Sequence, residues 1–195
     1  MMNIVPTNID KRVLRSQLLS LRQAMRPHLK QQHDDAICRG VRSLIYARHE
    51  LNAVVALYAP IRGEPDLMPL ADELLAAGFM VVLPVGVEKN APLKFAQYTR
   101  EDALVVSSLG ILEPDLSTLN AVLPDVVVVP CVGFDGKGHR LGYGGGFYDR
   151  TLAAFKSVGH EPMTIGVAYD EALVAFAVDA FDLPMDEIIT PMCAD

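Results

Sequence analysis

The residues best placed for chemistry lie in a glycine-rich stretch that runs from Pro130 to Arg150. Seven of the fourteen glycines in the chain fall between Gly133 and Gly146. The stretch follows the apolar run 126–129 and leads into a helix-like segment. Glycine lets backbone N–H groups come close to an anion, and a helix N-terminus adds partial positive charge at the same place. This pattern predicts a phosphate site after a buried strand; the alternative is a long turn that binds no ligand.

Charged residues within the glycine-rich stretch suit the same kind of ligand. Lys137 and Arg140 place fixed positive charge inside the stretch, where a guanidinium can bind phosphate oxygens in pairs. Asp149 lies four residues beyond Gly145. A carboxylate there is a candidate ligand for a hard cation that bridges phosphate oxygens.

A second source of positive charge is a helix expected from about Lys11 to Met25, with Asp10 as its N-cap. At helical spacing it carries an apolar stripe of Leu14, Leu18, Leu21 and Met25 and a basic stripe of Lys11, Arg15, Arg22 and Arg26. We expect Lys11 and Arg15, one turn apart, to point together at a phosphate. We expect Arg22 and Arg26 to lie on an ordinary solvated face.

The distribution of charge limits the class of partner. The net charge of -7 argues against nonspecific binding to nucleic acid. Nine of the seventeen Lys and Arg residues nevertheless fall between Lys11 and Arg48. This segment could be a nucleic-acid arm, but its amphipathic pattern favours docking against the body of the protein, where it could reach a phosphate.

The composition indicates a soluble globular protein. The 195 residues suffice for one well-cored domain over the whole chain, and 51% of them are hydrophobic. The three cysteines are far apart and show no zinc-ligand spacing. Without a signal-peptide pattern or an apolar run of membrane length, we expect a reduced, cytoplasmic protein.

Alternating strand and helix patterns must position these residues. Apolar runs predict buried strands at 53–58, 79–83, 126–129, 163–168 and 188–189, and a half-exposed strand at 93–98. Further helices are expected at about 31–48, 66–77 and 146–156. This order is typical of an α/β domain with a mainly parallel sheet that is covered on both faces.

The predicted parallel strands also direct attention to two further residues. The segment from 53 to 83 forms a β-α-β unit, and right-handed crossovers make its strands parallel. Ligands of such sheets bind beyond the carboxyl ends of the strands, so Tyr58, Glu64 and the loop after Pro84 are candidate site positions. Glu64 could instead be a helix-start residue that interacts with the helix dipole.

Residues 130–135 and 138–150 resemble the signature of a known family. They read Pro-Cys-Val-Gly-Phe-Asp and Gly-His-Arg-Leu-Gly-Tyr-Gly-Gly-Gly-Phe-Tyr-Asp-Arg. This closely resembles the signature of 5-formyltetrahydrofolate cyclo-ligases, also called 5,10-methenyltetrahydrofolate synthetases. The likeness extends to Lys11 and Arg15, the loop 58–64, the segment 110–114 and the tail 182–190.

The resemblance implies both a fold and a reaction. The fold is a three-layer α/β/α arrangement with a mainly parallel sheet (NagB/RpiA/CoA transferase-like). The reaction is an ATP-dependent, magnesium-requiring cyclisation of 5-formyltetrahydrofolate to 5,10-methenyltetrahydrofolate, with release of ADP and phosphate. In this family the formyl oxygen is thought to attack the γ-phosphate, after which N10 captures the activated carbon.

The resemblance also assigns residues to three ligands. It implies catalytic roles for Lys11 and Arg140. The residues implied for ATP are Lys11, Arg15, Arg140, Leu141, Gly142, Tyr143, Gly144, Gly145, Gly146, Phe147 and Tyr148. Those implied for folate are Tyr58, Glu64, Tyr143 and Phe147. Asp149 and Asp182 are implied for Mg²⁺, with Asp186 as an alternative to Asp182.

Two other functions remain as alternatives. One is a non-catalytic nucleotide- or folate-binding protein of the same fold, although such a protein would not need the full set of charge-neutralising groups. The other is a relative that acts on a sugar phosphate or an acyl-CoA. The full loop signature favours the cyclo-ligase, and we expect a monomer that binds small molecules and neither nucleic acid nor membrane.

Overall fold

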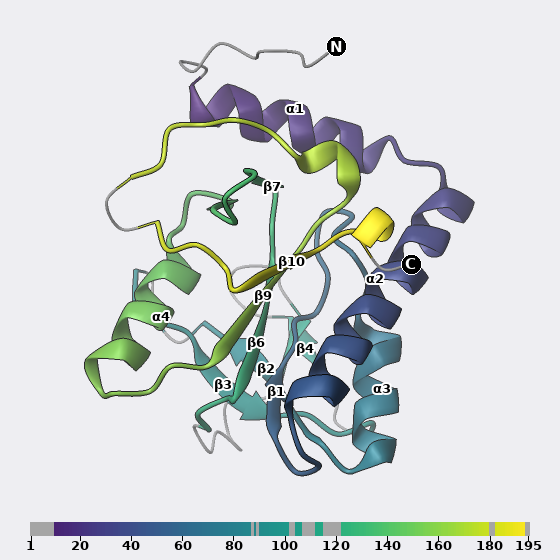
Figure 1. Cartoon of the computed structure of the whole chain (residues 1–195), viewed down its shortest axis with the longest axis vertical. Helices are drawn as coiled ribbons and strands as arrows, with labels where there is room; N and C mark the ends of the chain where they lie inside the picture. Colours follow the sequence, from purple (N-terminus) through teal and green to yellow (C-terminus); the bar gives the residue numbers. More distant parts are fainter. Residues whose placement is uncertain are drawn as a thin grey trace.

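A six-stranded sheet forms the centre of the computed structural model, which describes residues 10–86, 88, 90–101, 104–106, 112–114, 122–179 and 182–193. The strand order is β10-β9-β6-β1-β2-β3 (Figure 1). Five strands run parallel: β1 (Val54–Ala56), β2 (Met80–Val85), β6 (Val126–Pro130), β9 (Met163–Val167) and β10 (Glu187–Ile189). β3 (Lys94–Gln97) is antiparallel to β2. The predicted mainly parallel sheet is therefore confirmed.

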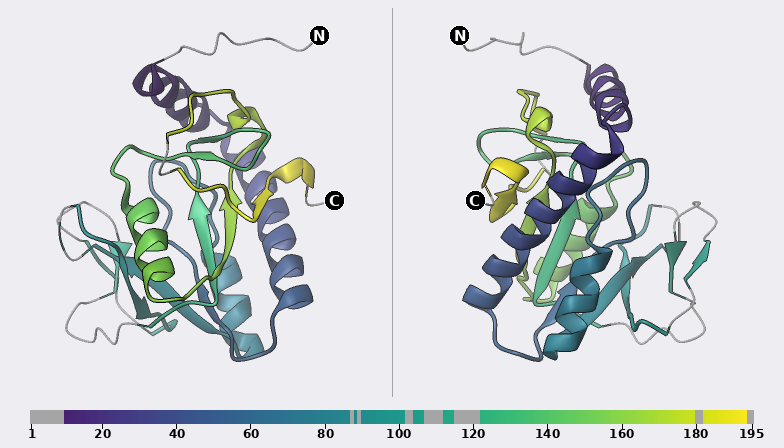
Figure 2. Two further views of the ribbon diagram at one scale, coloured as in Figure 1. Left: turned by 60° about the vertical axis from the view of Figure 1, so that its left-hand side comes forward. Right: turned by 90° about the vertical axis from the view of Figure 1, so that its right-hand side faces the viewer.

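Helices cover both faces of this sheet, which gives three layers (Figures 1 and 2). α2 (Pro27–Arg48) and α3 (Met68–Ala77) pack on one face. α4 (Phe147–Ser157) packs on the other face through Leu152 and Phe155. This is the α/β/α arrangement expected from the alternation of strands and helices.

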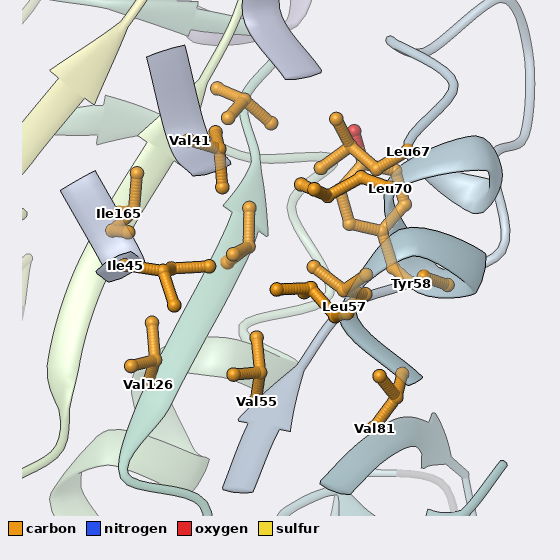
Figure 3. Close-up of a cluster of buried hydrophobic side chains, with 14 of the residues drawn as sticks. Val41, Ile45, Val55, Leu57, Tyr58, Leu67, Leu70, Val81, Val126 and Ile165 are labelled. Atoms are coloured by element: carbon orange, nitrogen blue, oxygen red, sulfur yellow. The ribbon is translucent and has the colours of Figure 1, made fainter. Parts of the chain in front are cut away.

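The apolar strands contribute side chains to two hydrophobic cores, one on each face of the sheet. Val126 and Val128 face α2 and α3, whereas Val127 and Val129 face the α4 side. Successive side chains of a strand point to opposite faces, so a strand buried on both faces needs apolar residues throughout. Figure 3 shows the first of these cores, where Ile45 of α2 lies near Val126.

α1 (Lys11–Gln23) lies beyond the carboxyl ends of the parallel strands (Figure 2). Asp10 caps it as predicted, with Oδ1 accepting from Arg12 N at 2.8 Å. Leu14 and Leu18 pack with residues of the glycine-rich stretch. The predicted apolar stripe is wrong at Leu21, which is 60% exposed, whereas Met25 is partly buried and packs against the main core.

The boundaries of several elements differ from the predicted ones. α2 begins at Pro27 rather than near 31, since proline is well suited to the first position of a helix. α3 begins at Met68, whose N–H donates to Asp66 Oδ1 at 3.0 Å, and ends at Gly78 in the left-handed conformation. The strand predicted at 53–58 is shorter, spanning 54–56, although Ala53 O and Leu57 N still form backbone hydrogen bonds with β2.

Smaller elements complete the described chain. They are the hairpin strands β4 (Val105–Val106) and β5 (Leu112–Glu113), the hairpin strands β7 (Gly133–Phe134) and β8 (Arg140–Leu141), and the 3₁₀ turns η2 (Asp170–Ala172) and η3 (Pro191–Cys193). The first two residues of the segment 110–114, which resembles the family, lie outside the described residues. None of the helices in the described ranges combines the length and apolar character needed to cross a membrane.

Candidate active site

A cavity of about 460 Å³ lies beyond the carboxyl ends of β1, β2 and β6. Every residue that the resemblance assigns to ATP, magnesium or folate contributes to its lining. α1, the loop after β1, the glycine-rich stretch and the start of α4 all meet there. Lys137 and Asp186 are not among its lining residues, so the charge expected from Lys137 lies elsewhere.

A short hairpin shapes the glycine-rich stretch. β7 and β8 pair antiparallel, with Phe134 opposite Arg140. Asp135 closes the turn between them, because its Oδ1 accepts from the N–H groups of Lys137 and His139 at 2.9 Å each and its Oδ2 lies 3.0 Å from the His139 ring. Burial of the Asp135 carboxyl raises its pKa, but these contacts outweigh burial and lower the pKa of Asp135. The turn is thus held by a charged carboxylate at neutral pH.

The stretch then leads directly into the N-terminus of α4. Gly146 is the N-cap residue with a φ of 62°, and no side chain caps the first-turn N–H groups. Gly144 has a φ of 94°, and a Cβ there would lie 3.5 Å from the guanidinium carbon of Arg15. Glycine therefore permits both the turn and the close approach of α1. The exposed N–H groups and the dipole of α4 favour an anion at this place.

Arg140 is the buried cation of the site. Its side chain is 5% exposed, and Nη2 donates to Asp149 Oδ1 in the first turn of α4. Nη1 is buried and has no hydrogen-bond partner among the described residues. A buried donor without a partner is costly, and here it belongs to a residue that lines the cavity. An anion that accepts from Nη1 would remove this cost.

Lys11 and Arg15 bring α1 to the same cavity. Lys11 Nζ lies 2.6 Å from Asp179 Oδ2 and 3.1 Å from Asp182 Oδ2. Burial of the Lys11 amine lowers its pKa, but the hydrogen bonds to both carboxylates outweigh burial and raise the pKa of Lys11. Arg15 Nε donates to Gly142 O at 2.7 Å, which ties α1 to the glycine-rich stretch. The predicted approach of Lys11 and Arg15 to one site is thus seen in the structure.

Glu64 contributes a buried carboxylate to another part of the cavity lining. Glu64 is 2% exposed; its Oε2 accepts from Ile61 N at 2.8 Å and its Oε1 from the Tyr143 hydroxyl at 2.7 Å. Burial raises the pKa of Glu64, while these hydrogen bonds and the charges of Arg22 and Arg62 oppose the rise. Burial also raises the pKa of Tyr143, which keeps its hydroxyl protonated as a donor.

Four residues in or near the cavity lining were not predicted as site residues. The cavity is lined by Arg62, Glu113 and Asp179. Arg22 does not line it but donates to the hydroxyl of Tyr143, which does. The expectation that Arg22 is solvated is wrong, because it is only 7% exposed. Arg62 and Glu113 did offer a signal, because each is a charged residue within a segment that resembles the family, the loop 58–64 and the segment 110–114.

Two residues expected at the site, Tyr58 and Asp186, form hydrogen bonds within the fold. The buried Tyr58 hydroxyl donates its hydrogen bond to Pro65 O at 2.8 Å. Its proton is therefore already used within the protein. Asp186 Oδ2 accepts from Thr164 N at 2.7 Å and from Thr164 Oγ1 at 2.8 Å. This places Asp186 at the junction of β9 and β10, away from the residues that line the cavity.

The carboxylates at the cavity suit a metal that is shared with a ligand. Among the described residues, no group of three or more His, Cys, Asp or Glu side chains could hold an ion by itself. Asp149 and Asp182 line the cavity, and each is paired with a cation, Arg140 and Lys11 respectively. Mg²⁺ is commonly held by one or two carboxylates together with substrate phosphates. The two aspartates fit that mode of binding.

Comparisons with known proteins point to one family. The model of the 5-formyltetrahydrofolate cyclo-ligase family matches residues 7–191. The 5-formyltetrahydrofolate cyclo-ligase of Escherichia coli strain K12 is 37% identical over 176 residues, covering 87% of this chain and 94% of the relative. The Haemophilus influenzae protein of that name is 32% identical over 190 residues, covering 93% and 98%.

Solved structures agree with these sequence matches. The 5,10-methenyltetrahydrofolate synthetase of Aquifex aeolicus has a TM-score of 0.76 and 32% identity, covering 93% of this chain and 89% of the other. The enzyme of that name from Mycoplasma pneumoniae has a TM-score of 0.75 and 26% identity, covering 94% and 99%. The resemblance of the glycine-rich stretch therefore extends to nearly the whole fold.

Proposed function

The chain belongs to the 5-formyltetrahydrofolate cyclo-ligase family, and we propose that its cavity binds ATP, Mg²⁺ and 5-formyltetrahydrofolate together. The enzyme converts 5-formyltetrahydrofolate to 5,10-methenyltetrahydrofolate, and its family depends on ATP in general. The observation that carries the proposal is that Arg140 Nη1, beside Asp149, has no hydrogen-bond partner in the part of the chain that the structure describes. A buried cation with an unused donor, next to a carboxylate, suits a metal-bound anion better than a neutral ligand.

The reaction needs a site that neutralises charge on phosphate oxygens. Transfer of the γ-phosphoryl group to the formyl oxygen leaves ADP and makes the former carbonyl oxygen a leaving group. N10 then bonds to that carbon, phosphate departs with the oxygen, and the N10 proton is released. Phosphoryl transfer depends mainly on positioning and on stabilising charge that is spread over the phosphate oxygens.

Three cations and a helix N-terminus supply that stabilisation in our proposal. Lys11 and Arg15 reach the cavity from α1, and Arg140 reaches it from β8. The glycine-rich run 141–148 would place backbone N–H groups against the phosphates, with Gly146 at the N-terminus of α4. Arg140 would act on the transferred group itself, because its Nη1 needs an acceptor.

Asp149 and Asp182 would hold Mg²⁺ when ATP is bound. The ion would neutralise phosphate charge and help to orient the phosphoryl group. Burial raises the pKa of Asp182, but hydrogen bonds from Asp179 N and Lys11 outweigh burial and lower this pKa, which keeps the Asp182 carboxylate charged at neutral pH. The cations that pair with the two aspartates would then turn to phosphate oxygens.

Glu64 and Tyr143 would bind the pterin part of the folate. A charged carboxylate can accept paired hydrogen bonds from the amino and ring N–H groups of a pterin. Phe147 and Tyr58 add aromatic surface to the lining. The buried Glu64 carboxylate has one hydrogen bond to each oxygen, so each oxygen retains a lone pair for substrate.

We also propose that the enzyme works in the cytoplasm as a monomer and has no nucleic-acid partner. Residues of one chain supply all the groups assigned to the three ligands. The net charge of -7 disfavours contact with a polyanion. Sedimentation of the purified protein with and without ATP would test the monomer.

The test is a direct assay of the ring closure. Purified protein is mixed with 5-formyltetrahydrofolate, ATP and magnesium, and the near-ultraviolet absorbance of the methenyl product is followed. Controls lack ATP or metal. We expect the band to grow only in the complete mixture; no growth, despite measurable ATP binding, would contradict the proposal in favour of a non-catalytic binding protein.

A further inference from the structure

Arg22 joins three separate segments around the proposed folate site. It lies in the last turn of α1 and is 7% exposed. Nε donates to Arg62 O at 3.1 Å in the loop after β1, and Nη1 makes a long contact of 3.5 Å with Cys131 O after β6. Nη2 donates to the Tyr143 hydroxyl in the glycine-rich stretch. Its guanidinium carbon also lies 5.6 Å from the centre of the Tyr143 ring.

We infer that Arg22 is a positioning residue for the folate: it directs the Tyr143 hydroxyl to Glu64 and so holds the buried carboxylate toward the cavity. Arg22 does not line the cavity, so it would act through Tyr143 and not by touching substrate. The inference rests on the proposed folate role of Glu64 and adds the group that orients it.

The donors and acceptors in the hydrogen bonds from Arg22 to Tyr143 and from Tyr143 to Glu64 can be assigned in only one way. Arginine is a donor only, so the Tyr143 oxygen must accept from Nη2. The hydroxyl proton is then free for the carboxylate, and the distance from Tyr143 Oη to Glu64 Oε1 is 2.7 Å. Without Arg22 the hydroxyl could rotate and donate elsewhere, which would leave Oε1 with one fewer fixed donor.

Charge supplies a second, measurable effect of Arg22. The titratable and charged groups that face Glu64 come from five segments: Arg22, Arg62, Tyr58, Cys131, Tyr143 and Tyr148. Only the two arginines among them carry positive charge. Burial raises the pKa of Glu64 and Arg22 opposes that rise, so loss of Arg22 should raise this pKa further. The carboxylate would then become protonated at a higher pH.

The experiment measures binding of 5-formyltetrahydrofolate by calorimetry as a function of pH. It uses the full-length protein and the variants Arg22→Met, Arg22→Lys and Arg12→Met. Arg12 is an exposed arginine of the same helix and serves as the matched control. Thermal melting of each variant shows that it is folded.

We expect Arg22→Met to weaken binding by about tenfold or more, as for loss of a hydrogen bond to a charged network. The pH below which binding is lost should also rise, whereas a merely structural role would leave that pH unchanged. Arg22→Lys keeps the charge but cannot make the forked contacts, so it should weaken binding while leaving the pH limit close to that of the wild type. Arg12→Met should match the wild type.

A double-mutant cycle tests whether Arg22 acts through Tyr143. In a Tyr143→Phe background, and at a pH where Glu64 is charged in every variant, Arg22→Met should cost little additional affinity, because the hydroxyl it orients is gone. Full additivity, or unchanged binding and pH limit in both Arg22 variants, would overturn the inference. Failure of the wild type to bind 5-formyltetrahydrofolate would instead count against the proposed function, so the two failures can be told apart.

Discussion

Arg140 and Asp149 form an ion pair between β8 and the first turn of α4, and Arg140 keeps a second donor buried beside the cavity, for which the described part of the chain offers no acceptor. Lys11 and Asp182 form a second such pair at the same cavity. Each pair thus joins a cation proposed for phosphate to a carboxylate proposed for metal. The two charges of each pair compensate one another, and in our proposal phosphate would take the place of the carboxylate and Mg²⁺ that of the cation.

Replacing Arg140 should impair catalysis more than folding. In Arg140→Ala we expect kcat/KM for the cyclisation to fall by about 10²–10³, the usual cost of one charge-stabilising donor in a closed site. Steady-state kinetics of methenyl formation measure this. Arg100→Ala is the matched control, since Arg100 pairs with Asp72 at 3.0 Å on an exposed surface. Near-normal catalysis by Arg140→Ala would remove Arg140 from the mechanism.

Replacing Asp149 should shift two measurements in opposite directions. Asp149→Asn removes a proposed metal ligand, so the Mg²⁺ concentration for half-maximal activity should rise by about tenfold or more. The same change frees Arg140 from its carboxylate, so ATP without metal should bind more tightly than to the wild type. Calorimetry in the presence of EDTA and a Mg²⁺ titration of activity measure the two effects. Equal losses of magnesium-dependent activity and folate binding would contradict a metal role.

Local patterns were sufficient to predict most of the fold. The run 126–129 is apolar throughout because both faces of β6 are buried, and Gly78 ends α3 because it adopts the left-handed conformation. Lys11 and Arg15 could be predicted to reach one site because helical spacing puts them on one face, and both line the same cavity. These features depend on residues close in sequence.

The sequence could not show which face of α1 is buried. Spacing predicts that Arg22 shares a stripe with Lys11, but its burial depends on the acceptors Arg62 O and Tyr143 Oη, which lie 40 and 121 residues away. Leu21, one residue earlier, is left exposed as a result. Asp179 was missed for the same reason, since its partner Lys11 is 168 residues away.

The charge of Asp135 should make the stability of the glycine-rich hairpin depend on pH. Asp135→Asn should lower Tm at neutral pH, because the carboxylate accepts the hydrogen bonds that close the turn. The pKa of this carboxyl is lowered from 3.8 in the folded protein, so its contribution is fully present above 3.8 and is lost as the pH falls through the lower, folded value. The Tm difference between variant and wild type should therefore shrink below pH 3.8.

Thermal melts at neutral and acidic pH check this dependence. Glu161→Gln, a change at an exposed carboxylate, is the control and should leave Tm nearly unchanged at neutral pH. A Tm difference for Asp135→Asn that stays constant down to the acid-unfolding range would show that the charge of Asp135 has no part in holding the turn.

Gly133 should couple the packing of α1 to ATP binding. A Cβ at this position would lie 2.8 Å from Leu18 Cδ1 of α1, 3.1 Å from Val174 Cγ2 and 3.3 Å from Ala172 O. Gly133→Ala must therefore displace the Leu18 side chain, and with it α1, or the β7 hairpin, and overpacking of this kind costs about 1–3 kcal/mol in the free energy of unfolding. Since α1 carries Lys11 and Arg15, we expect the KM for ATP to rise as well.

Gly136→Ala provides the matched control within the same hairpin. A Cβ at Gly136 meets nothing within 4 Å, so this variant should keep wild-type stability and KM. Thermal melts and ATP-dependent kinetics of both variants make the comparison. If Gly133→Ala lost stability but kept the wild-type KM for ATP, the position of α1 would not matter for nucleotide binding. Both effects are expected together because the same Leu18 contact that seats the helix also sets how far its two cations reach into the cavity.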